Sequence, residues 1–532
     1  MKSTSGPETI AALRDPACYP HPAEPVELIE THISWVFLAG EYAYKVKKPV
    51  DLGFLDFSTL KARRFYCEEE LRLNRRTAPE LYLGVVPITA GAAGPRLGGA
   101  GEAIEYALRM RRFPQEALAD SMARRGKLRT AQIDAIAAAI AAFHATIPSA
   151  PQDSAFGAPE HVAAPALANF EQLRKLDANP GEAVRLERLR AWTVNEGSRL
   201  HDVFAARRRG GFVRECHGDL HLRNIVFLEG RPLPFDCIEF DPELRWIDMA
   251  SEVAFLAMDL LEHGLEAAAW RFLNAYFETT GDYAGVRVLR YYLVYRATVR
   301  AKIACIRAHQ PGTGESAQCT SDRQYRDYLV LAESLALSAR PAIVLMHGLA
   351  GSGKTTIAQA ILERIRAVRV RSDVERKRLH GLAAQARTHA APYAGIYAPE
   401  TTRLTYDRLK QAVRDIVESG RTAIVDAAFL RRAEREEFRG LAAELEARFL
   451  IVWCRASEAA LRRRVAQREA AGNDASEAGI EVLENQIATQ EPLGADELAH
   501  AVPVDSESDE TRLQKAIGEI AARLTGSEAA HA

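Results

Sequence analysis

The feature that most constrains this chain is the segment MHGLAGSGKTT, from Met346 to Thr356. It contains the full pattern G-x-x-x-x-G-K-[ST] between an apolar run and a segment with helical spacing. That context predicts a phosphate-binding loop, because glycines let backbone N–H groups wrap phosphate oxygens and a helix N-terminus adds its positive dipole end. A glycine-rich turn without a ligand would leave the lysine unexplained. The residues expected to hold the nucleotide are Gly348, Gly351, Ser352, Gly353, Lys354, Thr355 and Thr356.

Two side chains of this loop have distinct expected roles. Lys354 should reach the β- and γ-phosphates of ATP, and Thr355 should bind Mg²⁺. From Pro341 onward, short apolar runs alternate with helical segments, which is typical of a parallel sheet with crossover helices. The sequence therefore predicts an α/β P-loop NTPase domain over residues 340–532.

Length and composition limit what else the chain can be. With 532 residues it is too long for one ordinary core, and we expect two domains. A formal net charge of -2 indicates no global basic surface for nucleic acid or an anionic membrane. Seven scattered cysteines without metal-ligand spacing, and no apolar stretch long enough for a bilayer, favour a cytoplasmic protein without a membrane span. The oligomeric state stays open.

Three further segments bear on the chemistry of the P-loop domain. Asp373, in RVRSDVERKRLHG, follows a strand and is suited to orient or deprotonate a hydroxyl, although it is also a candidate helix N-cap. Asp426 ends the strand TAIVD and is suited to hold Mg²⁺ through a water, or a substrate group. Arg464 and Arg468 are spaced i, i+4, so they share a helix face that either closes over the transferred phosphate or is simply solvated.

Together these segments resemble the small P-loop kinases, among them gluconate kinase, polynucleotide 5′-kinase, chloramphenicol phosphotransferase and zeta toxin. The resemblance spans roughly residues 341–524 and implies phosphoryl transfer to a hydroxyl, with Asp373 as base and Arg464 and Arg468 as lid groups. An AAA-like ATPase is the rival. Such a motor needs two adjacent acidic residues at the end of its Walker B strand. Here Asp426 is followed by Ala427.

A second signal lies in CHGDLHLRNIVF and the following PFDCIEF. Asp219 stands five residues before Asn224, and Asp236 follows a short strand. This order suits phosphotransfer of the protein-kinase type, in which one aspartate accepts the hydroxyl proton while an asparagine and a further aspartate hold Mg²⁺.

These residues resemble the aminoglycoside phosphotransferase branch of the protein-kinase-like fold, which implies an α+β domain over residues 1–335. The resemblance implies Asp219 as base, Asn224 and Asp236 as metal ligands, and Asp248 as a residue that steadies the loop. It further implies a lysine on a strand paired with a glutamate on a helix. Lys45 and Glu70 are the chosen pair.

Lys47 and Glu69 remain the alternatives for that pair. The glycine-rich loop of protein kinases is missing, since VFLAGEYAY supplies only Gly40. His144 and His221 are interpreted as core or loop histidines, because sequence spacing reveals no carboxylate partner for either.

The whole arrangement resembles the bacterial bifunctional aminoglycoside phosphotransferase/ATP-binding proteins. The expected function is transfer of the ATP γ-phosphate, at two nucleotide sites, to a small-molecule hydroxyl or a nucleic-acid 5′-hydroxyl. The alternative is a single active P-loop kinase that a nucleotide-binding phosphotransferase-like module regulates.

Overall fold

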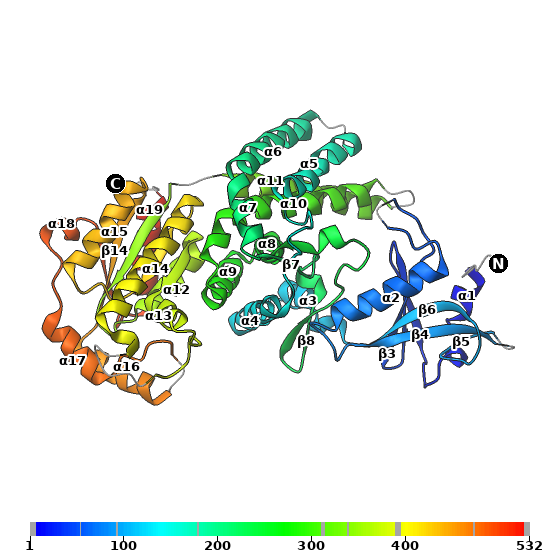
Figure 1. The fold of residues 1–532 in the computed structure, drawn as a ribbon, viewed down its shortest axis with the longest axis horizontal. Coiled ribbons are helices and arrows are strands. Elements are labelled where there is room, and N and C mark those ends of the chain that lie inside the picture. Colours follow the sequence, from blue (N-terminus) through cyan, green and yellow to red (C-terminus); the bar gives the residue numbers. More distant parts are fainter. Residues whose placement is uncertain are drawn as a thin grey trace. The chain divides into compact units, whose positions relative to one another are not determined.

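The structure is a computed structural model, and it describes residues 7–53, 55–91, 94–177, 180–309, 314–337, 340–388, 395–471 and 474–525. Its contacts divide the chain into two compact units. The first unit comprises Met1–Ala158 and Arg207–Asp259, and the second comprises Pro159–Ala206 and Leu260–Ala532 (Figure 1). The domain limits expected from sequence, 1–335 and 340–532, stay a prediction.

A six-stranded antiparallel sheet dominates the N-terminal part of the first unit. Its strand order is β1-β2-β3-β6-β4-β5, and helix α2 (Leu60–Asn74) packs against β4 and β6. A hairpin joins β2 to β3, where Ala39 pairs with Tyr42. The strands are β1 (Val26–Glu30), β2 (Ser34–Ala39), β3 (Tyr42–Lys47), β4 (Tyr82–Gly91), β5 (Gly94–Leu97) and β6 (Ala103–Arg111).

Strand β5 differs from the sequence-based expectation. The segment from Ala90 to Ala103 has the small-residue composition of a flexible hairpin loop, but residues 94–97 pair with 88–91 of β4. Sheet pairing uses backbone N–H and C=O groups, so a short strand of small residues at a sheet edge forms without a strong side-chain pattern. Residues 92–93 lie outside the described part of the chain.

The rest of the first unit is built from helices and two short strand pairs. Strand β7 (Val213–Glu215) pairs with β10 (Trp246–Asp248), and β8 (Ile225–Leu228) pairs with β9 (Arg231–Pro234). These two ladders flank the HGD segment and position it. The helices are α1 (Pro7–Ala12), α3 (Ala119–Arg124), α4 (Thr130–Thr146) and α8 (Met249–Glu262), the last of which runs across the boundary of the unit.

Long helices precede the P-loop in the second unit. They are α5 (Pro159–Leu176), α6 (Pro180–Arg199), α9 (Glu266–Thr280), α10 (Val286–Ala308) and α11 (Glu315–Ala336). Helix α7 (His201–Arg209) runs across the boundary between the units, which falls before Arg207. Helix α11 begins at Glu315 and packs along α10. Of the segment that joins the two helices, residues 310–313 lie outside the described part.

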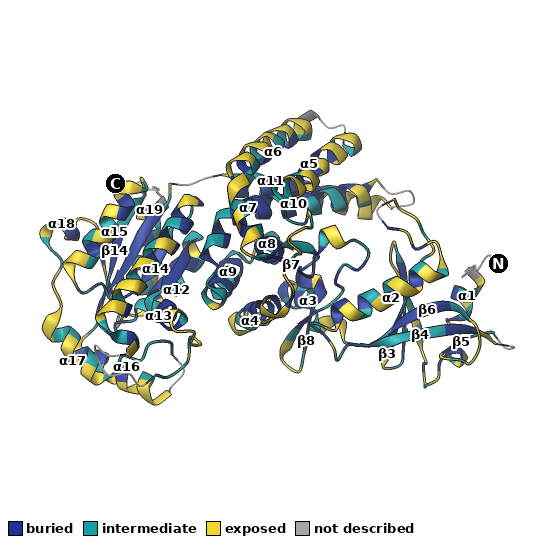
Figure 2. Cartoon of the chain, viewed as in Figure 1, coloured by how far each residue is buried: buried dark blue, intermediate teal, exposed yellow. Residues whose placement is uncertain are grey.

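A five-stranded parallel sheet forms the centre of the P-loop domain, in the order β12-β13-β11-β14-β15. All six residues of β11 are buried, which fits a parallel strand covered by helices and explains its uninterrupted apolar run (Figure 2). The strands are β11 (Ala342–His347), β12 (Val368–Arg371), β13 (Ala423–Asp426), β14 (Arg448–Arg455) and β15 (Ala501–Asp505).

Helices α12, α14, α15 and α19 pack against this sheet, while α16 and α17 pack against each other. The helices of the domain are α12 (Lys354–Ile365), α13 (Ser372–Leu379), α14 (Pro399–Glu418), α15 (Arg432–Glu444), α16 (Glu458–Ala471), α17 (Ile480–Thr489), α18 (Ala495–Leu498) and α19 (Glu510–Thr525). Single 3-10 turns are η1 (Pro16–Cys18), η2 (Gln115–Ala117), η3 (Leu222–Asn224), η4 (Pro242–Leu244), η5 (Tyr283–Gly285) and η6 (Gly395–Tyr397). Within the described residues, no helix has the length and hydropathy of a membrane span.

Candidate active sites

The loop between β11 and α12 requires glycine at two positions. Gly348 has φ 151° and Gly351 has φ 81°, values that side-chain-bearing residues rarely adopt. A Cβ at Gly348 would lie 2.5 Å from the carbonyl oxygen of Cys454, and one at Gly351 would lie 2.9 Å from that of Leu461. Gly353 then begins α12. The loop is thus a backbone cradle at a helix N-terminus, the arrangement that binds phosphate.

Lys354 lies across this cradle. Its Nζ donates to the carbonyl oxygens of Gly348 and Leu349, each at 2.8 Å. Burial lowers the pKa of Lys354, and the nearby Asp426 opposes that effect. A buried ammonium held by neutral carbonyls gains from an anionic ligand, because desolvation penalises its charge until an opposite charge arrives.

Thr355 and Asp426 meet at the carboxyl end of the sheet. The Thr355 hydroxyl donates to Asp426 Oδ2 at 2.8 Å, and Asp426 is 6% exposed. One hydroxyl oxygen and one carboxylate oxygen beside a phosphate cradle are the donors that hold Mg²⁺ in P-loop enzymes. The two residues therefore fit a Mg²⁺ ion, which would neutralise charge on the phosphates.

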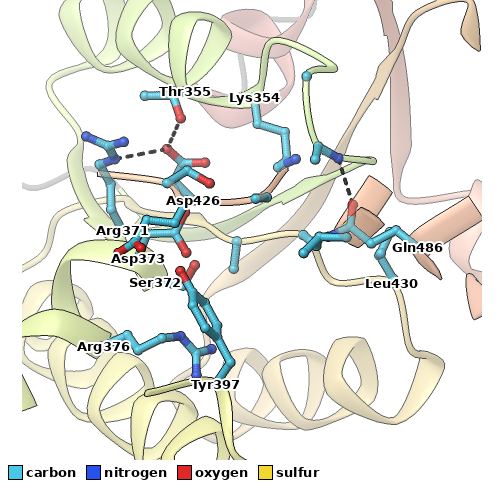
Figure 3. A pocket seen from close by; sticks show the side chains of 18 of the residues that line it. Lys354, Thr355, Arg371, Ser372, Asp373, Arg376, Tyr397, Asp426, Leu430 and Gln486 are labelled. Carbon is cyan, nitrogen blue, oxygen red and sulfur yellow. Dashed lines mark hydrogen bonds and ion pairs between the residues drawn. The ribbon is translucent and has the colours of Figure 1, made fainter. Parts of the chain in front are cut away.

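A pocket of about 570 Å³ brings the predicted P-loop residues together (Figure 3). Ser352, in the same loop, is 1% exposed and packs beneath Gly348. The predicted residues that line the pocket are Gly351, Gly353, Lys354, Thr355, Thr356, Asp373, Asp426, Arg464 and Arg468. The structure thus gathers the loop, both aspartates and both arginines around a single cavity.

Asp373 lies inside α13 rather than at its N-cap. The N-cap residue is Arg371, without a side-chain cap hydrogen bond, so the capping interpretation of Asp373 is wrong. Asp373 instead lines the pocket, together with Arg376 and Tyr397 (Figure 3).

The two lid arginines of α16 contact loops around the pocket. Arg464 Nη1 donates to the Gly351 carbonyl at 3.2 Å and to Ser506 Oγ at 2.7 Å. Arg468 Nη2 donates to the Ala478 carbonyl at 2.6 Å. Since both side chains line the pocket, the solvated-face interpretation does not describe them.

Sequence reasoning missed several polar residues of this pocket, among them Arg371 and Gln486. Arg371 ends β12, and its guanidinium forms ion pairs with Asp426 (Nε to Oδ2, 3.7 Å) and Asp474 (Nη2 to Oδ1, 3.2 Å). Gln486 Oε1 accepts from the Ala350 N–H at 2.8 Å. Arg371 stands at a strand end directly before the quoted Ser-Asp pair, which is a weak positional signal; Gln486 has no sequence signal.

The first unit contains a second cluster of predicted residues, centred on Lys45. Its Nζ donates to Glu70 Oε1 at 2.8 Å and to Asp236 Oδ1 at 2.6 Å. Lys47, the alternative lysine, donates to Glu70 Oε2 at 2.8 Å and also pairs with Glu239. The structure thus joins Glu70 to both lysines, while only Lys45 of the two contacts Asp236 within the described residues.

Glu70 is fully buried, whereas Glu69 is partly exposed and pairs with Arg72 and Arg245. Burial raises the pKa of Glu70, but the two lysines outweigh that effect and lower it to about 2. The carboxylate is therefore ionised at neutral pH and holds the lysines in place. This geometry supports the choice of Glu70, and its role toward a nucleotide stays a prediction.

The HGD loop and the strand before Asp236 are tied together. Asn224 Nδ2 donates to Asp219 Oδ2 at 3.1 Å and to its carbonyl oxygen at 3.0 Å. His217 Nε2 hydrogen-bonds the Phe235 carbonyl at 2.8 Å, and the Phe235 N–H donates to the Asn224 carbonyl at 2.9 Å. The candidate base and the two candidate metal ligands thus belong to one hydrogen-bonded loop system.

Asp236 has a strained backbone, with φ 63° at a residue that is not glycine. Its N–H donates to Tyr82 Oη at 2.9 Å, and the next N–H, of Cys237, donates to Asn74 Oδ1 at 2.9 Å. These contacts hold the carboxylate toward Lys45. Carboxylate and amide oxygens, as in Asp236 and Asn224, are the donor types that Mg²⁺ accepts.

Glu252 holds the HGD loop through hydrogen bonds to its backbone, and sequence reasoning missed this residue. Its carboxylate accepts from the N–H of His217 at 2.9 Å and of Gly218 at 2.7 Å. His144 Nε2 lies 3.1 Å from Glu252 Oε1. Burial raises the pKa of Glu252, but the hydrogen bond to His144 and the nearby His217 lower it to about 2.

Asp248, which the resemblance implied for that supporting role, makes other contacts. Its two carboxylate oxygens accept from Arg207 at 2.6 and 2.8 Å. His221 Nε2 lies 3.3 Å from Asp219 Oδ2. His144 and His221 therefore each have a carboxylate partner, although sequence spacing revealed none. Glu252 comes from a distant segment, and Asp219 is brought close to His221 by the turn of the loop.

The comparisons with known proteins agree with this geometry. A family model described as "Phosphotransferase enzyme family" matches residues 63–289, and one described as "AAA domain" matches residues 343–493. An uncharacterized protein of Mycobacterium tuberculosis (strain ATCC 25618 / H37Rv) is 30% identical over 468 residues, covering 87% of this chain and 91% of that protein.

Two solved structures are among those to which parts of the chain are similar. A putative kinase from Chloroflexus aurantiacus is 19% identical, covers 35% of this chain and 98% of its own, and has a TM-score of 0.28. A choline/ethanolamine kinase family protein from Mesorhizobium loti is 12% identical, covers 62% of this chain and 98% of its own, and has a TM-score of 0.35.

The family matches and the pocket chemistry together identify the protein as an ATP-dependent kinase. The match to the mycobacterial relative covers 87% of this chain, so it reaches both segments that the family models match. The chain therefore belongs to the family of two-domain proteins in which an aminoglycoside phosphotransferase-like domain is followed by a P-loop kinase-like domain.

Proposed function

We propose that the protein has two phosphotransfer sites, each of which passes the γ-phosphate of ATP to a hydroxyl group. The observation that carries the proposal for the P-loop site is the pocket shared by Lys354, Asp373, Asp426 and Arg464. This pocket combines a loop that can bind phosphate, the oxygens of Thr355 and Asp426 that fit Mg²⁺, the carboxylate of Asp373 and the guanidinium of Arg464.

At the P-loop site, each side chain has one proposed task. Lys354 leaves the carbonyls of its own loop and binds the β- and γ-phosphates. Asp373 accepts the proton of the attacking hydroxyl as the O–P bond forms and the bond from phosphorus to ADP breaks. Arg464 and Arg468 stabilise the charge that spreads over the transferred group.

At the first site, Asp219 is the proposed proton acceptor. The hydrogen bonds from Asn224 orient its carboxylate, as a positioned base requires. Lys45 binds phosphate while Glu70 keeps it in place, and Asn224 and Asp236 hold Mg²⁺. Lys45 must then share its contact to Asp236 with the bound nucleotide.

The proposed acceptor is a small molecule or a nucleic-acid 5′-hydroxyl. A pocket of about 570 Å³ has the size of a small-molecule site.

An acceptor screen on the full chain tests the proposal. Radiolabelled ATP is offered with sugars, aminoglycosides, amino alcohols and 5′-hydroxyl oligonucleotides, to the wild type and to the Lys354→Ala and Asp219→Asn variants. Two sites predict two groups of products, each abolished by one variant only. If Asp219→Asn leaves every activity intact, the proposal of two active sites fails and a single P-loop kinase with a regulatory module replaces it.

A further inference from the structure

Glu278 joins the end of α9 to strand β12 of the P-loop domain. Its Oε1 accepts from Arg371 Nη1 at 3.1 Å, and its Oε2 accepts from Arg369 Nη2 at 2.9 Å. The two arginines are two residues apart on one strand, so their side chains leave it on the same face. All three side chains are less than one-fifth exposed. Burial raises the pKa of Glu278, but the two guanidiniums outweigh it and lower the pKa.

The position of Glu278 relative to β12 is set by several other hydrogen bonds. Asn274, one turn earlier on α9, accepts from the Arg369 N–H at 2.7 Å and donates to the Ala367 carbonyl at 2.9 Å. Arg378 donates to the carbonyl oxygens of Glu278 and Thr279. Helix α9 thus packs against β12, the outer strand of the parallel sheet, and provides hydrogen-bond partners for backbone groups at this sheet edge. Glu278 is held on a rigid element.

Arg371 connects Glu278 to the metal-fitting oxygens of the P-loop pocket. Its Nε lies 3.7 Å from Asp426 Oδ2, the same oxygen that accepts from Thr355. Its Nη2 pairs with Asp474 at 3.2 Å. A full positive charge therefore stands beside the carboxylate that fits Mg²⁺ (Figure 3). Glu278 is one of the groups that balance this charge.

We propose that Glu278 is a positioning residue that sets the divalent-cation affinity of the P-loop site by holding Arg371 off Asp426. This inference rests on the proposed Mg²⁺ site at Thr355 and Asp426. With Glu278 present, the guanidinium divides its hydrogen bonds and its charge among three carboxylates. Without it, the guanidinium turns toward Asp426, competes for Oδ2 and repels a cation there.

The consequence reaches beyond one ion pair. Glu278 lies in α9, within the segment that the phosphotransferase family model matches, whereas Arg371 and Asp426 belong to the segment matched by the second model. Cation binding at the P-loop thus depends on a carboxylate from outside the P-loop fold. An isolated P-loop domain lacks this carboxylate and would need more Mg²⁺.

The test is a Mg²⁺ titration of nucleotide binding to the full chain, which needs no turnover. A fluorescent ATP analogue reports binding, and the part of the signal that Lys354→Ala abolishes is assigned to the P-loop site. In Glu278→Gln, the Mg²⁺ concentration for half-maximal binding is expected to rise about tenfold, while binding at saturating Mg²⁺ is unchanged. Glu278→Asp should restore part of the wild-type affinity.

Glu266→Gln is the matched control. Glu266 also lies on α9 and pairs with a P-loop-domain arginine, Arg366, but that pair does not reach the pocket lining. The control is expected to keep the wild-type Mg²⁺ dependence. An equal shift in both variants would mean that docking of α9 alone matters, and this would overturn the role assigned to Glu278.

A double-variant cycle makes the inference independent of any folding defect in Glu278→Gln. Arg371→Gln removes the competing cation and is expected to lower the half-maximal Mg²⁺ concentration, and adding Glu278→Gln to it should then change nothing. If Glu278→Gln raises that concentration equally with and without Arg371, the inference fails. If the wild type shows no Mg²⁺-dependent signal that Lys354→Ala removes, the proposed P-loop function itself fails.

Discussion

The hydroxyl of Thr355 donates to the carboxylate of Asp426 across 2.8 Å, although 71 residues separate them in the chain. The parallel sheet makes this possible, because β11 and β13 are neighbours and their carboxyl ends meet at one edge. Thr355 follows the loop after β11, and Asp426 ends β13. The ligands proposed for one Mg²⁺ ion thus come from the sheet order rather than from proximity in sequence.

Lys354→Ala is expected to weaken ATP binding at the P-loop site about tenfold to a hundredfold, the loss of a charged hydrogen bond worth about 1.5–3 kcal/mol. Calorimetry with a non-hydrolysable ATP analogue measures it. Lys354→Arg, which keeps the charge with a bulkier head, is the companion variant and should also bind less well, because Nζ lies within a tight loop of carbonyls. Unchanged affinity in the alanine variant would contradict the assignment.

Asp373→Asn is expected to lower kcat at the P-loop site by about a hundredfold or more, the usual contribution of a positioned general base. Nucleotide affinity should change little, because Asp373 lines the pocket outside the glycine loop and its proposed contact is with the acceptor hydroxyl. Steady-state kinetics and nucleotide binding measured on the same variant separate the two effects. A turnover within twofold of the wild type would remove Asp373 from the role of base.

Arg464→Ala is expected to reduce kcat about tenfold to a hundredfold, since its guanidinium lies beside Gly351 at the mouth of the cradle. Arg462→Ala is the matched control on the same helix. Arg462 pairs with Glu458 and Glu484 on the exposed face, and its loss should leave kcat nearly unchanged. Equal losses in the two variants would indicate damage to α16 rather than loss of a lid group.

Asp219→Asn is expected to lower the rate of product formation at the first site by about a hundredfold or more, while nucleotide binding is retained. Asp241→Asn serves as its control, because Asp241 caps η4 in the same unit and is not among the proposed ligands. Product analysis by acceptor class gives the readout. Persistence of every product at the wild-type rate would argue for a binding module in place of an active site.

Glu252→Gln is expected to destabilise the first unit by roughly 1–3 kcal/mol at pH 7, because the buried N–H groups of His217 and Gly218 lose an anionic acceptor. The pKa of Glu252 is lowered from 4.5 to about 2 in the folded protein. The contribution of the Glu252 charge to the free energy of unfolding is therefore complete above about pH 4.5 and is lost as the pH falls through about 2.

Denaturant unfolding of the wild type and of Glu252→Gln across pH 7 to 3 measures this contribution. The difference in free energy of unfolding between the two should be largest at neutral pH and should shrink below pH 4.5. A difference that stays constant down to pH 3 would mean that the charge of Glu252 does not hold the HGD loop.

Motif residues could be assigned from sequence because each motif is contiguous. The loop from Gly348 to Thr355 and the order of Asp219, Asn224 and Asp236 have spacings that predict their chemistry directly. The two-domain fold and the kinase class were predicted in the same way, and the family matches confirm them. The strand β5 escaped prediction because backbone pairing alone forms it.

Supporting residues could not be assigned in this way. Glu252 holds the HGD loop in place of the expected Asp248, and nothing in its spacing distinguishes the two carboxylates. Lys45 and Lys47 are both within reach of Glu70, so alternation along the strand left them equivalent. Contact with Asp236 separates them, and that contact depends on how the strand lies against the loop.

The sequence by itself predicted a phosphate-binding loop and the carboxylates at the strand ends beside it, because the geometry of a glycine loop and of strand ends is local. Only the tertiary structure decided which charges balance those groups. The pairing of Arg371 with Glu278 and Asp426 joins three segments that are distant in the chain. A buried ion pair depends on through-space distance and burial, and neither is encoded in the spacing of residues along the chain.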